Sequence, residues 1–279
     1  MTIKNQLKTA MLLAVLTALL LWIGSFFGRA GFYFALVFVG AMNIASYWFS
    51  DKIVLWMYRA KQAKESEYPK LYKVVKEISR LSGLPIPKVY VIPSEQSNAF
   101  ATGRNPNNAA VAATEGIIKI LNEEELKGVI AHEFAHIKNR DILISTVAGT
   151  IAGVISYIGN MFMWSAMFGD DDNRGNIFGL LFLAIITPIA ASIIQLAISR
   201  SREYLADETG ARFVNNGKHL ADALEKIEKN VAAHPMRFGT QATAHLFISS
   251  PFRHGVFLNL FLTHPRTDER TRRLRAMKF

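Results

Sequence analysis

The chain has 279 residues, of which 51% are hydrophobic, and it carries a formal net charge of +10. A water-soluble domain rarely combines so apolar a composition with so basic a charge, whereas a membrane protein with basic flanks does. Basic charge also suits nucleic-acid binding, but no basic recognition helix, aromatic platform or zinc-finger spacing accompanies it, so we expect no nucleic-acid partner. The absence of cysteine excludes disulfides and thiolate metal sites, which leaves histidine and carboxylate side chains as metal ligands.

Two apolar segments open the chain, at residues 9–27 and 30–49. Each has about 18–20 uncharged residues, enough to cross a hydrocarbon core of about 30 Å as a helix. Lys4 and Lys8 before the first segment resemble the flank of a signal peptide, but no cleavage site leads into a polar region. We therefore predict a retained transmembrane hairpin over residues 1–50.

Two further apolar segments, at residues 142–168 and 177–199, flank an acidic turn. We predict a second transmembrane hairpin over residues 142–199, and the alternative is a buried hairpin of a soluble core. Lysine and arginine concentrate on one side of the four predicted spans, with only Arg29 and Arg174 on the other. The positive-inside rule therefore places both termini, and residues 51–141 and 200–279, in the cytoplasm.

The first cytoplasmic segment contains recognisable helix and strand patterns. Residues 61–82 have apolar positions at helical spacing, and glycine and proline break the pattern at residues 83–87. Residues 88–92 are predicted to form a strand, residues 94–108 a loop, and residues 109–113 a second short strand.

A helix beginning at Asn122 carries the sequence H-E-x-x-H. Asn122 and Glu125 stand at the positions of a capping box, which favours a helix start here. His132 and His136 lie about 40° apart around the helix axis, so both imidazoles can bind one Zn²⁺. Glu133 is rotated about 100° from His132 and is left to reach a water molecule. The alternative is two ordinary surface or core histidines.

A catalytic zinc site needs a third protein ligand and an open position. Glu203 follows the fourth predicted span, and the transmembrane hairpin returns it to the membrane face that holds the two histidines. Asp207, one turn further along, is placed to accept a hydrogen bond from a ligand imidazole. The alternative for Glu203 is an ion pair with a nearby arginine.

Four motifs together resemble those of the HtpX-like membrane proteases, which belong with the Ste-type CAAX-processing metalloproteases. The motifs are N-A-F-A-T-G at 98–103, H-E-x-x-H-x-x-N ending at Asn139, S-R-E-Y-x-A-D at 201–207, and Thr263-His264-Pro265. The resemblance covers almost the whole chain. It implies an α+β, mainly α fold, with four transmembrane helices in two hairpins and a cytoplasmic gluzincin-type domain with a small β-sheet.

The resemblance also implies an activity. It predicts a zinc endopeptidase of the bacterial cytoplasmic (inner) membrane, with one Zn²⁺ per chain held by His132, His136 and Glu203. The expected substrates are damaged or misfolded membrane proteins, and the expected partners are membrane lipid and other membrane quality-control proteases.

The remaining roles follow from this chemistry. Glu133 is predicted to be the general base, and His264 is our candidate for the donor to the oxyanion, with a surface histidine as the alternative. Asn139 shares a helix face with the site and could hold the helix or contact its neighbours. Substrate is expected to add as a strand to a sheet edge. The edge we predict is made of small side chains: Ala109, Ala110, Val111, Ala112 and Ala113. The loop segment over 98–103 could border the same cleft.

Two rival functions and one open question remain at this point. An intramembrane protease is disfavoured because Lys127, Lys138, Arg140 and Asp141 bracket the motif. A scaffold or chaperone with a structural zinc is disfavoured because it needs neither Glu133 nor an open coordination position. The basic tail at residues 266–278 either contacts anionic lipid headgroups or covers the domain.

Overall fold

The computed structural model describes residues 28–148, 151, 200–234, 246–248 and 265–279, and isolated residues between 7 and 25. In that first part they are residues 7, 10, 11, 13, 14, 17, 18, 20–22 and 25. His264, about half of the first predicted span and nearly all of the second predicted hairpin lie outside the described residues.

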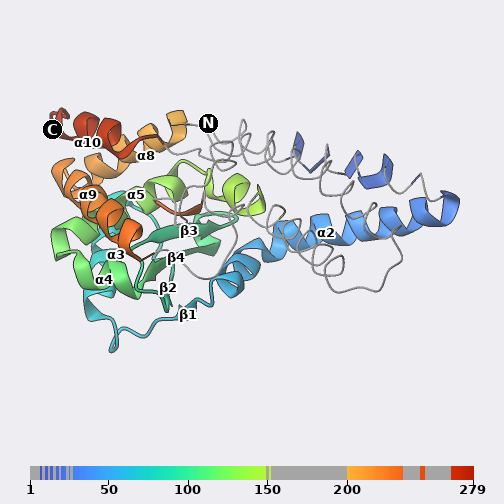
Figure 1. The fold of residues 1–279 in the computed structure, drawn as a ribbon, viewed down its shortest axis with the longest axis horizontal. Helices are drawn as coiled ribbons and strands as arrows, with labels where there is room; N and C mark the ends of the chain where they lie inside the picture. Colours follow the sequence, from blue (N-terminus) through green and yellow to red (C-terminus); the bar gives the residue numbers. More distant parts are fainter. Residues whose placement is uncertain are drawn as a thin grey trace.

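A four-stranded mixed sheet lies at the centre of the domain (Figure 1). Its spatial order is β1 (Lys61–Gln62), β2 (Lys88–Ile92), β4 (Ala109–Thr114) and β3 (Ala99–Gly103). β2 and β4 are parallel, whereas β1 and β3 pair antiparallel at the two edges. The predicted strands at residues 88–92 and 109–113 are confirmed, with β4 one residue longer.

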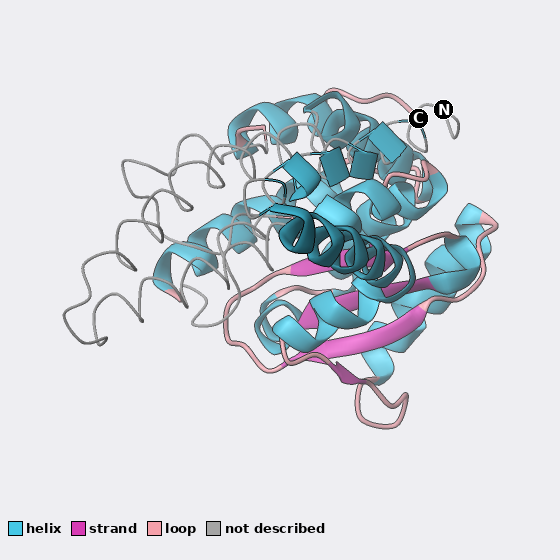
Figure 2. Ribbon diagram, turned by 90° about the vertical axis from the view of Figure 1, so that its right-hand side faces the viewer, coloured by secondary structure: helices cyan, strands magenta, loops and turns pink. Residues whose placement is uncertain are grey.

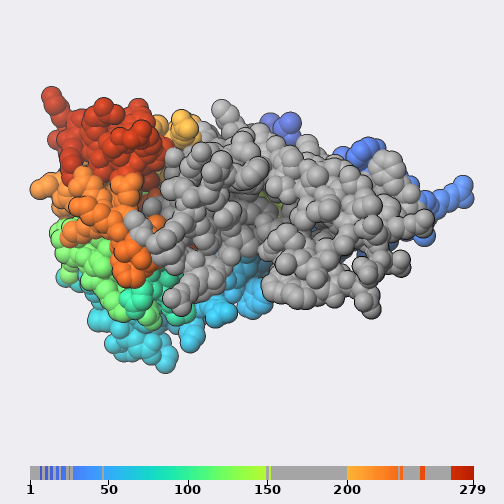
Figure 3. Space-filling model, viewed as in Figure 1, coloured from blue at the N-terminus to red at the C-terminus, as the bar shows by residue number. Residues whose placement is uncertain are grey.

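Helices cover the sheet, as Figure 2 shows from the side. Their bounds are α3 Pro69–Ser82, α4 Glu115–Ile120, α5 Glu123–Lys138, α8 Arg200–Phe213, α9 Lys218–Ala233 and α10 Thr267–Arg275. α5 contacts β3 and β4 as well as α3, α8 and α9, so it is the central helix of the domain. α10 packs on α9 and α8 at the end of the molecule away from the exposed part of α2 (Figure 3).

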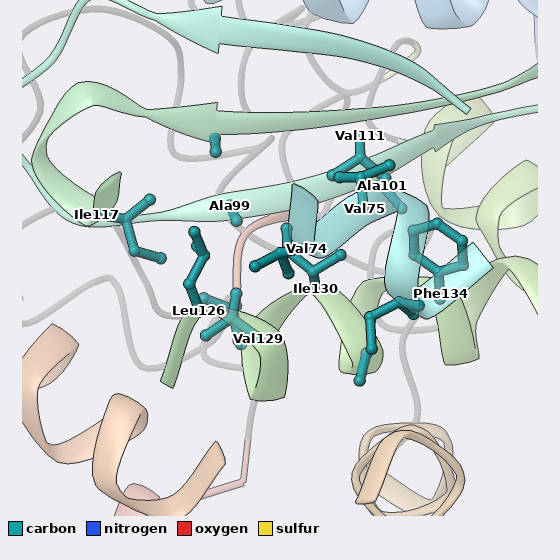
Figure 4. Packing of buried hydrophobic residues seen from close by; sticks show 14 of the residues in the cluster. Val74, Val75, Ala99, Ala101, Val111, Ile117, Leu126, Val129, Ile130 and Phe134 are labelled. Carbon is teal, nitrogen blue, oxygen red and sulfur yellow. The ribbon is translucent and has the colours of Figure 1, made fainter. Parts of the chain in front are cut away.

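The main core lies between α5, α3 and the sheet. Figure 4 shows Leu126, Val129, Ile130 and Phe134 of α5 together with valines of α3 and residues of the strands. All four α5 side chains are fully buried. Burial of an aliphatic or aromatic side chain contributes about 1.5–3 kcal/mol, so this face fixes α5 firmly on the sheet.

Two sequence predictions for the first cytoplasmic segment are wrong. The helix expected over 61–82 begins only at Pro69, and Lys61 and Gln62 instead pair with β2. Proline favours the first helical turn because it lacks the N–H that would be unsatisfied there. The loop expected over 94–108 contains strand β3 and a 3₁₀ turn at Pro106–Asn108.

The predicted edge strand is also wrong. β4 pairs with β2 through Ala110 and with β3 through Ala109, so it is a central strand of the sheet. All six of its residues are buried. Short side chains on two buried faces look alike whether a strand is central or at an edge, which is why the sequence misled us.

Helix α2 (Gly28–Met57) extends away from the domain in Figure 1. Within the described residues it is the one helix long and apolar enough to cross a membrane, over the window Gly28–Ala45, of which 11% is buried. Its last turns enter the domain, where Val54 and Leu55 pack with Phe100. The helix thus passes through the domain boundary that we predicted at residue 50.

The described part of the first apolar segment packs beside α2. Asn43 Nδ2 donates to Thr17 Oγ1 at 2.8 Å, and Leu13 and Leu20 share an apolar cluster with Met42. The same cluster includes residues 144, 147, 148 and 151, which open the third predicted span.

Candidate metal centre

Helix α5 begins as its sequence predicts. Asn122 Oδ1 accepts the Glu125 backbone N–H at 2.8 Å, and Glu125 Oε2 accepts the Asn122 backbone N–H at 2.9 Å. This capping box fixes the first turn, and the acidic residues there suit the positive end of the helix dipole. His132 and His136 consequently lie one turn apart on a well-defined helix.

Helix α8 crosses α5 closely at Gly210. A Cβ atom at this position would lie 2.8 Å from the backbone nitrogen of His132, closer than real Cβ atoms approach. Glycine is therefore required here so that the two backbones can meet. The crossing places Glu203, from the first turn of α8, beside the two histidines of α5.

The three predicted ligands converge. Nε2 of His132 and Nε2 of His136 are 3.1 Å apart, and they lie 3.8 and 3.7 Å from the two carboxylate oxygens of Glu203. Two donors bound tetrahedrally at about 2.05 Å to one zinc ion would be about 3.3 Å apart. The observed separations match that value to within about 0.5 Å, so the side chains fit a common metal ion.

Each histidine is oriented by a carboxylate behind it. His132 Nδ1 lies 2.9 Å from Asp207 Oδ1, and His136 Nδ1 lies 3.2 Å from both oxygens of Asp141. A carboxylate at Nδ1 favours the tautomer that carries its proton there, which leaves Nε2 as a lone-pair donor. Two such lone pairs at 3.1 Å repel one another unless a cation lies between them.

The electrostatics of the site favour a cation. Burial lowers the pKa of His136, but the charge and hydrogen bond of Asp141, helped by Glu203 and Glu133, outweigh burial and raise it to about 10. In the metal-free protein a proton therefore occupies the place that a metal ion would take.

Arg270 lies behind the site, on α10. Its Nε and Nη2 donate to Asp207 Oδ2 and Oδ1 at 2.9 and 2.7 Å, and its side chain is 2% exposed. Burial raises the pKa of Asp207, but Arg270 and His132 outweigh burial and lower it to about 2. Since α10 packs on α8 and α9, this part of the basic tail covers the domain, one of our two open alternatives.

Both alternatives for Glu203 have contacts in the structure, because its carboxylate faces the two imidazoles and the charges of Arg202 and Arg270 also reach it. Arg270 Nη1 is 4.0 Å from Glu203 Oε2, at the outer limit for an ion pair, whereas both carboxylate oxygens face the imidazoles. The Arg270 guanidinium therefore interacts only weakly with Glu203. The direct partner of Arg270 is Asp207.

Glu133 lies beside the three ligands and is 2% exposed. Burial raises its pKa, although the two histidines and the backbone N–H of Ala101 lower it in part. These residues border a small cavity of about 30 Å³, which is room for about two water molecules. The far wall of the cavity is formed by Leu246, Phe247 and Ile248.

The sheet edge that reaches the site is β3. Ala101 lines the cavity, and its backbone N–H donates to Glu133. Ile248 donates its N–H to Ala99 O at 3.1 Å, so the chain itself occupies the Ala99 end of this edge. The motif over 98–103 therefore borders the cleft, as the sequence suggested, but as an edge strand rather than a loop.

The structure also locates Asn139 and two residues that sequence reasoning did not include in the site. Asn139 ends α5, where its N–H donates to Ala135 O at 2.8 Å; its Nδ2 has no hydrogen-bond partner among the described residues. Asp141 and Arg270 were missed as members of the site. The one local signal for Asp141 is its place directly after the helix end; Arg270 carried none, since it stands among four other arginines.

The fold and the His-His-Glu centre define a metallopeptidase. Residues 65–278 match the model of peptidase family M48. The chain is 52% identical over 280 residues to a protein of Syntrophobacter fumaroxidans named Protease HtpX homolog, covering 98% of this chain and 99% of that protein. A Pyrococcus abyssi protein of the same name is 50% identical over 275 residues, covering 97% and 95%.

A solved structure shares the fold. Ste24p of S. mikatae aligns with a TM-score of 0.51 at 19% identity, over 98% of this chain and 66% of that chain. The chain belongs to peptidase family M48 and is a metalloprotease of the HtpX type. The resemblance stated from its motifs is thereby confirmed.

Proposed function

We propose that this protein is a zinc endopeptidase, anchored in the bacterial cytoplasmic membrane, that cleaves damaged or misfolded membrane proteins on the cytoplasmic side. The observation that carries the proposal is the convergence of His132, His136 and Glu203 with Glu133 beside them. The exposed apolar helix α2 supports the membrane anchor.

Zinc fits the donor set best. Two imidazole nitrogens and one carboxylate within 4.8 Å of one another suit zinc, whereas calcium and magnesium prefer oxygen ligands alone. A bound zinc ion lowers the pKa of a water molecule and polarises the carbonyl of the bond to be cut. The other contributions come from the side chains of the chain.

Glu133 supplies the proton transfers. Its buried carboxylate has a raised pKa, which makes it a better base than an exposed glutamate. It takes a proton from the attacking water and then gives that proton to the departing amine. His264 remains our candidate for a donor to the oxyanion, and Asn139 remains a candidate support for the site helix.

Substrate binds along β3 in this proposal. The outward-facing backbone of an edge strand offers hydrogen bonds to any extended peptide, with little selection by side chains. Ala101 and Gly103 have short or no side chains, so a substrate backbone can approach this edge closely. This replaces the earlier prediction for residues 109–113, which lie in a central strand.

Protein purified in detergent and supplied with zinc tests the proposal. Cleavage of casein should stop on addition of a chelator and return with zinc, and Glu133→Gln should keep zinc but lose activity by at least about 100-fold. Zinc content equal to the parent protein serves as the control for folding of the variant. A protein that binds zinc and never cleaves would instead be the scaffold with a structural zinc.

A further inference from the structure

The C-terminal half of α2 carries the residues that mark a membrane boundary. Tyr47, Trp48 and Phe49 follow the apolar window after one intervening serine and are 40%, 53% and 48% exposed. Aromatic side chains of this kind gather at the headgroup level of a bilayer. Gly28 and Trp48 are separated by about 30 Å of helix, the thickness of a hydrocarbon core. Trp48 thus lies at the headgroup level on the membrane face that carries the domain.

Strand β3 is fixed to α2 at this level. The guanidinium of Arg104, the residue after β3, lies 4.3 Å from the ring centre of Trp48. Cation–π contacts contribute about 0.5–2 kcal/mol, so this contact helps hold the end of β3 against the helix.

A second contact fixes the direction of β3. Tyr58, just past the end of α2, packs on Phe100 with ring centres 5.8 Å apart. Trp48 and Tyr58 are about 15 Å apart along the helix axis. Arg104 and Phe100 are about 13 Å apart along an extended strand. Because the two lengths agree, β3 runs alongside α2 with its Ala99 end pointing away from the membrane.

The active site lies at a definite height above the bilayer as a result. Glu133 accepts the backbone N–H of Ala101, which is about 10 Å from Arg104 along the strand. The headgroup layer of one leaflet is about 5–8 Å thick, so the site lies just outside it. At the far end of the edge, Ile248 already occupies Ala99 O, and on the membrane-proximal part Ala101 N–H donates to Glu133 and Gly103 N–H donates to Thr146 Oγ1 at 3.4 Å. A substrate strand is therefore left to pair with the carbonyl oxygens of Ala101 and Gly103.

We propose that the α2–β3 contacts act as a ruler for the cut, so that the scissile bond is selected by its distance from the membrane. An extended chain covers about 10 Å in three residues and a helical chain in about seven. Cleavage therefore falls about three to seven residues beyond the point where the substrate leaves the headgroups. This inference rests on the proposed peptidase function, and it names juxtamembrane segments as the substrate class.

The test uses the full chain, loaded with zinc, in phospholipid vesicles. The reporter is a single hydrophobic span followed by a repeating cleavable sequence, and variants carry insertions of about two and three flexible residues directly after the span, short enough for the cut to stay within the repeat. Cut positions are read by mass spectrometry. We expect the cut to stay at the same distance from the span, so that it moves upstream in the repeat by the length inserted.

Variants of the ruler give an independent readout. Trp48→Ala combined with Arg104→Ala should spread the cuts over a wider range of distances, while cleavage of the same repeat as a soluble peptide stays unchanged. Trp56→Ala is the matched control, because Trp56 is 79% exposed on the same helix and should leave the cut position as it is.

Two results separate this inference from the proposed function. Cuts that remain at one place in the repeat whatever the insertion, or that keep their distribution in the double variant, overturn the ruler alone. Failure to cut the soluble peptide as well overturns the peptidase function and the ruler with it.

Discussion

Replacing Arg270 with methionine tests the electrostatic support behind the metal centre. Methionine keeps much of the arginine volume but removes both charged hydrogen bonds to Asp207, at 2.9 and 2.7 Å. The Asp207 carboxylate is then buried without its compensating cation. Breaking one side of a buried ion pair is far more costly than removing the whole pair, because it leaves a desolvated charge.

Protonation limits the electrostatic part of this cost, to which the lost hydrogen bond from Arg270 Nη1 to Ile248 O at 3.2 Å adds. Asp207 can escape its unpaired charge by taking a proton, which at pH 7 costs about 4 kcal/mol for a carboxyl of ordinary pKa. We therefore expect Arg270→Met to lower the free energy of unfolding by about 3–4 kcal/mol at pH 7. At pH 5 the limit falls to about 1.5 kcal/mol, because the proton is easier to acquire.

The sign of the pH dependence follows from the pKa of Asp207. With Arg270 present this pKa is about 2. The ion pair therefore stabilises the fold fully at a pH above the ordinary carboxyl pKa of 3.8, and this stabilisation is lost as the pH falls towards 2. Without Arg270 the carboxyl becomes protonated at higher pH. The deficit of the variant is thus largest near neutrality and narrows on acidification.

Thermal unfolding of the metal-free protein in detergent measures the effect. A loss of about 3–4 kcal/mol corresponds to a fall in Tm of roughly 6–15 °C. Arg272→Met is the matched control, since Arg272 is exposed on the same helix. Adding Asp207→Asn should recover much of the loss, because no charge is then unpaired. Equal deficits at pH 5 and pH 7, or a Tm like that of the control, would refute the reasoning.

Three further predictions concern the metal site. Asp141→Asn should weaken zinc binding by about 10- to 100-fold, because His136 loses the carboxylate at Nδ1; calorimetric titration measures this, and unchanged affinity would exclude the role. Zinc affinity should rise about tenfold per pH unit near neutrality, because the raised pKa of His136 makes a proton compete with the metal; a flat profile would contradict this. Gly210→Ala should weaken zinc binding, because its Cβ would lie 2.8 Å from the His132 nitrogen. Gly40→Ala, whose Cβ meets nothing within 4 Å among the described residues, is its control.

Local signals in the sequence were sufficient for the catalytic helix. The capping box of Asn122 and Glu125 depends on residues three apart, and the pairing of His132 with His136 depends on one helical turn. Glu203 was predicted from the expected topology, since a hairpin that leaves and returns would bring its two ends together. Each of these inferences needs only short-range geometry or one expected transmembrane hairpin.

Long-range packing decided what the sequence could not show. In the sequence, Arg270 is one of several arginines in a basic tail. Its burial depends on how α10 packs against α8 and α9. The strand order likewise could not be predicted from the sequence, because β3 precedes β4 in the chain yet lies at the edge of the sheet beside it. Pairing partners of a strand are a property of the whole fold, so no pattern within residues 99–114 distinguishes the edge from the centre.

Small side chains explain both this failure and the way the site is built. β3 and β4 are rich in alanine, so they lack the alternating pattern that marks an edge strand with one exposed face. The same smallness lets the Ala101 backbone reach Glu133, and Gly210 lets α8 approach His132. Larger residues at these positions would have made the strands easier to interpret, but would have separated the backbone elements that bring the metal ligands and the base together.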